Sequence, residues 1–145
     1  METLRDELND ALLDLVRRVE RSANEQREKR YASFGVSAFD GEALARLAAF
    51  PEGLSSYDWG ELCELDPKAT QALTRRAVQA GWVQRARSGR QSLLSLTEEG
   101  QRLVDKTRTA TRGMFSKPLQ ELRLDELRTL VASLNRVLNT MNRET

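Results

Sequence analysis

Residues 66–90, DPKATQALTRRAVQAGWVQRARSGR, constrain the fold of this chain more than any other segment. Asp66 is a typical helix N-cap, and Pro67 suits the first helical position, where its missing N–H costs no intrahelical hydrogen bond. Gly81 follows about four turns later and ends the helix, because glycine tolerates a positive φ. The segment therefore predicts a helix with well-defined ends.

A β-hairpin is predicted directly after this helix, in which Trp82–Arg85 leads to a glycine-containing tip and Ser92–Leu96 returns. Basic residues outnumber acidic ones six to one in residues 66–90. They are Lys68, Arg75, Arg76, Arg85, Arg87 and Arg90. A helix with a basic outer face, followed at once by a basic hairpin, is the arrangement that a winged helix presents to DNA.

The composition excludes most enzyme chemistry. The 145 residues include no histidine, which removes catalytic triads, His–metal clusters and histidine proton shuttles. The single cysteine, Cys63, can form neither an internal disulfide nor a cysteine-rich metal site. Because no nucleophile–base pair can be assembled, we expect a protein that is not an enzyme and has no catalytic residues, metal or cofactor.

No targeting or membrane segment is predicted. No apolar run approaches the ~20 residues that cross a bilayer. The N-terminus, METLRDELND, also lacks the apolar core of a signal peptide. We therefore expect a cytoplasmic protein without a membrane partner.

Long amphipathic helices are predicted at both ends of the chain. In the first, over residues 3–31, apolar residues recur at three- and four-residue steps. These residues are Leu4, Leu8, Leu12, Leu15, Val16 and Val19. The last helix, from about Leu124 to Met141, carries Leu127, Leu130, Val131, Leu134, Val137, Leu138 and Met141 on one stripe. A small chain cannot easily bury this much apolar surface against itself, which predicts a homodimer formed through both terminal helices.

Further helices are predicted between these ends. Asp40 is the expected N-cap of the second helix, with Phe39 and Leu44 as a hydrophobic staple and Pro51 as a stop. Its predicted inner face is Leu44, Leu47, Ala48 and Phe50. A fifth helix is expected to start at Thr97 and to run through Met114 until Pro118.

A short third helix completes a helix-turn-helix order with the helix that Asp66 begins. Ser55 is its expected N-cap, with Asp58 at the third helical position. Gly60 costs about 1 kcal/mol relative to alanine in a helix, but a small residue suits a close helix crossing. The residues expected to point inward are Trp59, Cys63 and Leu65 on this segment and Thr70, Leu73, Thr74 and Ala77 on the next helix.

The chain resembles MarR-family transcriptional regulators, which are winged helix-turn-helix dimers. Three stretches carry the resemblance: LSSYDWGELCELD at 54–66, Gly81-Trp82-Val83, and LSLTEEGQRLV at 94–104. It implies a mainly α fold with a small β-hairpin wing and six helices, in one domain over residues 1–145. The implied dimerisation region is residues 1–35 and 105–145, and the DNA-binding lobe is about residues 39–104.

One departure from the family pattern lies in the wing. Relatives usually carry Asp-x-Arg, whereas this chain has Ser88-Gly89-Arg90 in a shorter wing. The arginine that the family inserts into the minor groove is thus present as Arg90, but Ser88 replaces the aspartate that orients it.

Candidate DNA contacts follow from the basic segment and the resemblance. Gln71 is the best candidate for reading a base edge, because an amide pairs bidentately with adenine. Lys68 and Arg75 suit bases or phosphates, whereas Arg76, Arg85 and Arg87 suit phosphates. Backbone N–H groups near Ser55 and Ser56 are further phosphate donors. The alternative is that the basic face is simply exposed to solvent and contacts no partner.

The resemblance also implies a pocket for a small aromatic ligand between the first, second and fifth helices. Its candidate residues are Tyr31, Phe34, Phe39, Arg46 and Phe50. The alternative is that the aromatic residues belong to the core. Cys63 could act as an oxidant sensor, but its position matches a core leucine, and free cysteine packs well as a small apolar residue.

These observations favour a DNA-binding transcriptional regulator, a repressor that binds a pseudo-palindromic operator as a homodimer and could be released by a small aromatic effector. The alternative is a winged-helix protein-interaction module that has lost DNA binding, which the altered wing would accommodate.

Overall fold

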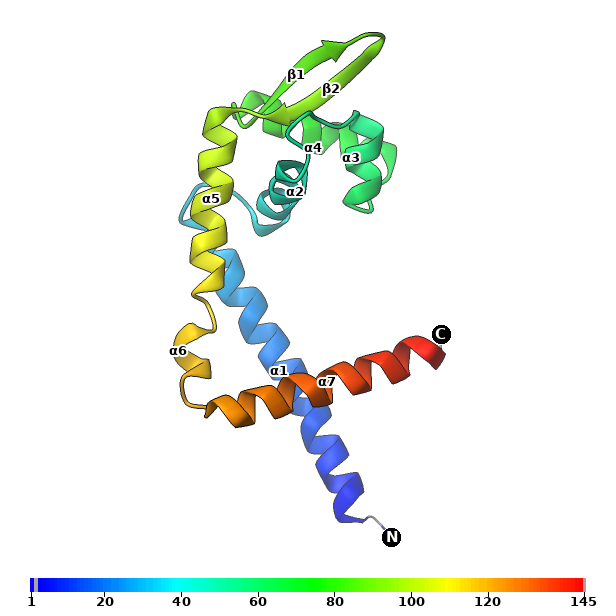
Figure 1. The fold of residues 1–145 in the computed structure, drawn as a ribbon, viewed down its shortest axis with the longest axis vertical. Coiled ribbons are helices and arrows are strands. Elements are labelled where there is room, and N and C mark those ends of the chain that lie inside the picture. Colours follow the sequence, from blue (N-terminus) through cyan, green and yellow to red (C-terminus); the bar gives the residue numbers. More distant parts are fainter. Residues whose placement is uncertain (2, 145) are drawn as a thin grey trace. The chain divides into compact units, whose positions relative to one another are not determined.

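The structure is a computed structural model that describes Met1 and residues 3–144. Over these residues it contains seven helices and one two-stranded antiparallel sheet, so the predicted mainly α fold with a small hairpin is confirmed (Figure 1). The elements are α1 (Leu4–Ala32), α2 (Ala38–Ala48), α3 (Ser56–Leu62), α4 (Pro67–Gln79), β1 (Val83–Ser88), β2 (Gln91–Leu96), α5 (Glu98–Arg112), α6 (Ser116–Leu119) and α7 (Leu124–Glu144). The six predicted helices are present, and the four-residue α6 is additional.

The chain divides into two compact units, one up to Thr111 and one from Arg112 onward. The first contains α1 to α5 and the hairpin, and the second contains α6 and α7. The fifth helix was predicted to continue to Pro118, which is wrong. It ends at Arg112, directly before Gly113, so that Met114 lies outside it.

The helix-turn-helix forms with the predicted caps. The Ser55 hydroxyl accepts from the N–H of Asp58 (3.0 Å), and the Asp66 carboxylate accepts from the N–H of Ala69 (2.7 Å). Between the two helices, Leu65 N–H donates to the carbonyl of Gly60 (2.9 Å) while Glu64 takes a left-handed conformation with φ of 58°. This local bonding makes the turn between α3 and α4 tight.

The start of α2 corrects one prediction. Ser37, not Asp40, is the N-cap, and its hydroxyl accepts from the N–H of Asp40 (3.1 Å). Phe39 therefore lies inside the helix, and the predicted staple with Leu44 does not arise at this cap. Leu44 is buried as predicted, but Phe50 is exposed.

The core lies among α2, α3, α4, the hairpin and α5. Its fully buried large side chains are Trp59, Leu44, Leu47, Leu73, Leu94 and Val104. Trp59 also donates its indole N–H to the carbonyl of Ala43 (2.9 Å), so its one polar group is satisfied inside the core. The predicted inner face of α4 is confirmed, because Thr70, Leu73, Thr74 and Ala77 are all buried.

Gly60 of α3 lies directly against Thr70 of α4. A Cβ at this position would overlap Thr70, lying 2.8 Å from its Cγ2 and closer still to its hydroxyl oxygen. Thr70 cannot easily turn away, since its hydroxyl donates to the carbonyl of Asp66 (2.8 Å). The expected close crossing at Gly60 is thus confirmed, and it sets the position of α4.

The hairpin pairs Val83 with Leu96 at its base and Ser88 with Gln91 at its end, which leaves a two-residue turn of Gly89 and Arg90. Gly89 has a φ of 64°, as the first central position of a type II′ turn requires. On β2, Leu94 exchanges two backbone hydrogen bonds with Leu54 (2.9 and 2.7 Å). The wing is therefore anchored to the segment that precedes α3.

Each long terminal helix leaves its apolar stripe exposed in the single chain. On α1 all six predicted stripe residues are exposed and Tyr31 is the only buried residue of the helix. On α7 no residue is buried. In the described part of the chain, no helix combines the length and apolarity that crossing a membrane would require.

Candidate functional site

The outer face of α4 is polar and basic because its inner face is occupied by the core. Lys68, Gln71 and Arg75 are exposed, and they lie on the side of the helix away from the buried Leu73. Pro67 is the first residue of the helix, a position at which a backbone N–H would have no intrahelical partner, so the missing N–H of proline costs nothing. These three predicted DNA contacts therefore project from one surface of α4.

A cationic groove brings four predicted site residues together. Ser56, Gln71, Arg75 and Arg85 come from α3, α4 and β1. The complete lining is Ser56, Gln71, Thr74, Arg75, Val78, Gln79 and Arg85, around a volume of about 420 Å³. Two guanidinium groups and two amides without a carboxylate form a surface suited to an anion.

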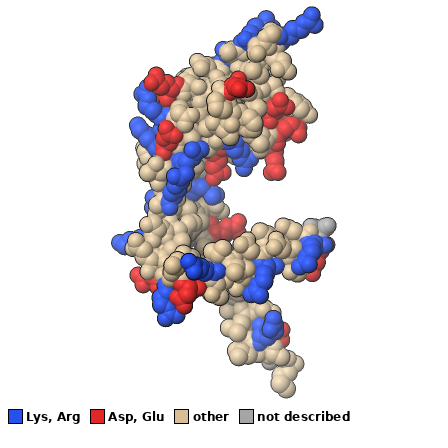
Figure 2. Space-filling view, in the orientation of Figure 1, with Lys and Arg blue, Asp and Glu red and all other residues tan. Residues whose placement is uncertain are grey.

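The rest of the wing extends this basic surface. Arg85 and Arg87 lie two residues apart on β1 and so share one face of the hairpin, whereas Arg90 occupies the turn. Figure 2 shows Lys and Arg side chains at the tip of the hairpin. In the described part of the chain, no carboxylate forms a salt bridge with Lys68, Arg75, or the three wing arginines, so these charges stay available.

Arg76 departs from the predicted set. Its Nε and Nη2 donate to Oδ2 (3.0 Å) and Oδ1 (2.8 Å) of Asp40, and this hydrogen bonding raises the pKa of the guanidinium. The bidentate pair joins α4 to the first turn of α2. Arg76 therefore has a structural partner, and the phosphate contact at this residue stays a prediction.

Ser55 and Ser56, at the start of α3, have different surroundings. The hydroxyl of Ser55 is engaged as the N-cap, whereas Ser56 is half-buried at the edge of the cationic groove. Both remain predicted phosphate neighbours.

Solved structures share this architecture. No protein-family model matches the sequence, and no curated protein matches it. MepR, the transcription regulator of the multidrug efflux pump MepA of Staphylococcus aureus, matches with a TM-score of 0.80 and 19% identity, over 88% of this chain and 96% of that chain. The multiple antibiotic-resistance repressor MarR of Listeria monocytogenes matches with a TM-score of 0.70 and 17% identity, over 99% of each chain. A MepR–DNA complex of S. aureus matches with a TM-score of 0.68 and 19% identity, over 88% of this chain and 95% of that chain.

This chain has the MarR-family winged-helix fold. Within that fold, α3 and α4 are the helix-turn-helix and β1 and β2 form the wing.

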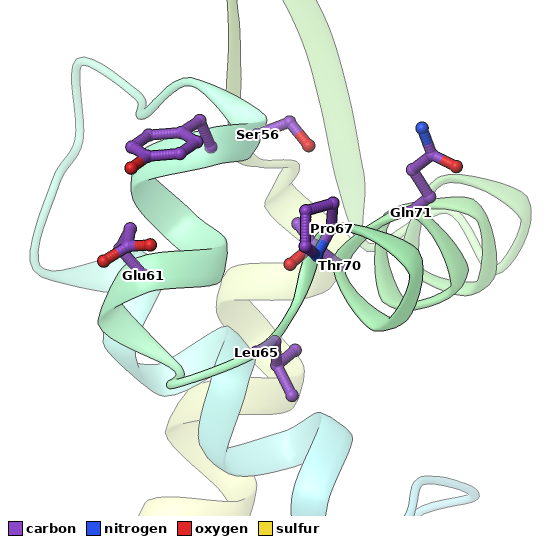
Figure 3. A pocket seen from close by; sticks show the side chains of 7 residues that line it. Ser56, Glu61, Leu65, Pro67, Thr70 and Gln71 are labelled. Carbon is purple, nitrogen blue, oxygen red and sulfur yellow. The ribbon is translucent and has the colours of Figure 1, made fainter.

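A second hollow of the MarR-type helix-turn-helix lies between α3 and α4 (Figure 3). It is lined by Ser56, Tyr57, Glu61, Leu65, Pro67, Thr70 and Gln71, around about 190 Å³. We call it the apolar hollow, because aliphatic and aromatic groups make up most of its lining. In Figure 3, the side chains of Ser56 and Gln71 lie at the same end of the hollow, with Leu65 at the other.

Sequence reasoning overlooked Tyr57. This residue is 70% exposed, a large fraction for an aromatic residue. Helical spacing contained the information, since Tyr57 lies two residues before the buried Trp59 and so faces the opposite side of α3.

The five candidate effector residues do not form one pocket. Phe39 and Arg46 line a hollow of about 210 Å³ with Glu42, Ala43, Cys63 and Glu64. Phe34 borders a different hollow with residues of α5, and Tyr31 is buried against Gly41. Of the four aromatic candidates, only Tyr31 belongs to the core. The effector site stays a prediction, and two carboxylates beside Arg46 oppose an anionic ligand there.

Cys63 is half-buried against the core and free. Burial raises the pKa of its thiol, and the charge of Arg46 offsets only part of that shift. The thiol is therefore protonated at neutral pH, when it is a poor nucleophile, which agrees with a packing role. The described residues contain no cluster of three or more His, Cys, Asp or Glu that could hold a metal ion.

Proposed function

We propose that this protein is a DNA-binding transcriptional regulator that acts as a homodimer on a pseudo-palindromic operator. The cationic groove carries the proposal, because Gln71 and Arg75 of α4 and Arg85 of β1 line one surface. A solvated face normally mixes charges of both signs. The absence of a carboxylate from the groove lining therefore favours an anionic partner.

The groups suit distinct parts of a duplex. With α4 in the major groove, Gln71 would pair with adenine, and Arg75 and Arg85 would contact phosphates on either side. Arg87 would add a phosphate contact, and Arg90 at the turn of the wing would enter the minor groove.

The homodimer is supported by the exposed apolar stripes. Contiguous apolar surface on this scale marks a protein interface in a water-soluble chain. A two-fold axis would place two α4 helices about one helical turn of DNA apart, which requires a pseudo-palindromic site. We assign the regulator as a repressor, as the MarR of L. monocytogenes is described.

The test is the salt dependence of binding to a duplex that the purified protein selects from random DNA. Five cations per chain, Lys68, Arg75, Arg85, Arg87 and Arg90, give up to about ten phosphate-neutralising groups per dimer. Affinity should fall by about a thousandfold or more between roughly 50 and 200 mM salt, because phosphate contacts release counterions. An affinity that does not change with salt, or the failure to select any sequence, would exclude DNA binding. The winged-helix protein-interaction module would then be the better interpretation.

A further inference from the structure

Two hollows flank Gln71 on the same face of the helix-turn-helix, and they differ in charge. The cationic groove contains Arg75 and Arg85 and no carboxylate. The apolar hollow contains Glu61 as its one charged group. Ser56 and Gln71 line both.

The charge of the apolar hollow argues against a phosphate. A carboxylate in the lining repels a phosphate, and neither Arg nor Lys lies beside it to compensate. Its volume of about 190 Å³ is also below the ~300–1,000 Å³ typical of small-molecule pockets. A small apolar group on a larger molecule fits both properties.

The location of the hollow points to a base edge. Pro67 is the first residue of α4 and Gln71 follows about one turn later, and the N-terminal residues of a recognition helix contact base edges. In the major groove, the apolar group that bases present is the C5 methyl of thymine. The exposed ring of Tyr57 supplies one wall of the hollow from α3.

We propose that the apolar hollow receives the C5 methyl of a thymine in each half-site, with Tyr57 as a specificity-determining residue. This inference rests on the proposed DNA binding and names the base that the site selects. Gln71 at the shared rim reads an adenine next to that thymine. Selectivity for thymine at this position comes from shape and apolar contact, whereas selectivity for the adjacent adenine comes from the Gln71 amide.

The test replaces thymidine by deoxyuridine, one position per half-site at a time, in the duplex selected by the wild-type protein. Deoxyuridine keeps every hydrogen-bonding group and lacks only the methyl. At one position, the substitution should lower the DNA-binding affinity about fourfold per half-site, the value for one buried methyl-sized group. Other positions should be neutral.

Three variants separate Tyr57 from general DNA affinity. In Tyr57→Ala the deoxyuridine penalty should disappear at that position, whereas Tyr57→Phe should keep it. Arg75→Gln should weaken binding to both duplexes equally and leave the penalty intact. Because Tyr57 is exposed, thermal unfolding of both Tyr57 variants should match the wild type.

Two results would overturn the inference while salt-dependent DNA binding still stands. One is that every thymidine in the wild-type duplex can be replaced without loss. The other is that the penalty persists unchanged in Tyr57→Ala. If no duplex is selected at all, the proposed function fails and the thymine site fails with it.

Discussion

The winged-helix lobe (α2 through α5 with the hairpin) and the two long terminal helices treat their apolar residues in different ways. The lobe buries Trp59, Leu44 and Leu47 completely within one chain. On α7, by contrast, no residue is buried, and stripe residues such as Leu134 and Val137 stay exposed. Both regions have the same helical periodicity, so periodicity alone does not tell where an apolar face will be buried.

This difference separates two sources of stability. A core closed within one chain gives stability that does not depend on protein concentration. An apolar face that is completed by a second chain gives stability that rises with concentration. Variants in the two regions should therefore differ in kind as well as in magnitude.

The largest effect is expected from Leu134→Asp combined with Val137→Asp. Burying a leucine or valine contributes about 1.5–3 kcal/mol, and a two-fold interface loses four such side chains. The dimer dissociation constant should rise by more than about a thousandfold, and DNA binding should be lost with it. Light scattering across a concentration series gives the mass, and Ala132→Asp with Asn139→Asp, on the opposite face of α7, is the control. A variant that remains dimeric would show that the α7 stripe is not the interface.

Leu47→Ala tests the closed core. Removing a fully buried leucine should lower the free energy of unfolding by about 2–5 kcal/mol, because a cavity remains. Urea unfolding should show this loss at every protein concentration, while light scattering still reports the wild-type mass. A loss below about 0.5 kcal/mol, as for an ordinary surface substitution, would mean that the lobe is not closed around Leu47.

Gly60→Ala tests the crossing of α3 and α4 within the lobe. Overpacking costs about 1–3 kcal/mol, and the higher helix propensity of alanine returns about 1 kcal/mol. We expect the free energy of unfolding to fall by up to about 2 kcal/mol, as measured by thermal unfolding. Adding Thr70→Ala removes the overlapping side chain and should recover part of the loss. If the double variant is no better than Gly60→Ala, the contact does not limit the crossing.

The smallest effects should separate two neighbouring arginines. Arg75→Gln removes a phosphate contact and should lower the salt slope of DNA binding by roughly 1 per substituted site. Arg76→Gln should leave that slope unchanged and reduce the stability by at most about 1 kcal/mol, because its ion pair with Asp40 is partly exposed. Equal slopes for the two variants would contradict the separate roles.

Local features of the sequence predicted most of the lobe. The caps at Ser55 and Asp66, the inner face of α4 and the hairpin all depend on neighbours within a few residues, and all are confirmed. The α2 cap was missed because both Ser37 and Asp40 are good N-cap residues, and Asp40 instead takes the third helical position. The prediction for α5 fails because the helix ends at Arg112, directly before Gly113, and does not continue to the proline at position 118.

Contacts between distant residues explain the remaining differences in the site. Arg76 is paired with Asp40 across 36 positions of the sequence, which no local pattern reveals. The effector candidates form a cluster in the sequence because four of them lie within about twenty residues of Tyr31, yet Phe34 and Phe39 border different hollows in the fold. The groove at Gln71 likewise needs α3, α4 and β1 to be packed before its lining is complete.

Hydroxyl-radical footprinting of the selected duplex, with the number of bound chains measured on the same complex, tests the central claim most directly. Two chains should bind each duplex and protect two half-sites whose centres lie about 10 base pairs apart, or a multiple of that spacing. Arg90 should add protection in the adjoining minor groove. One chain per duplex, or protection of a single half-site, would contradict a homodimer that reads DNA through α4 and the wing.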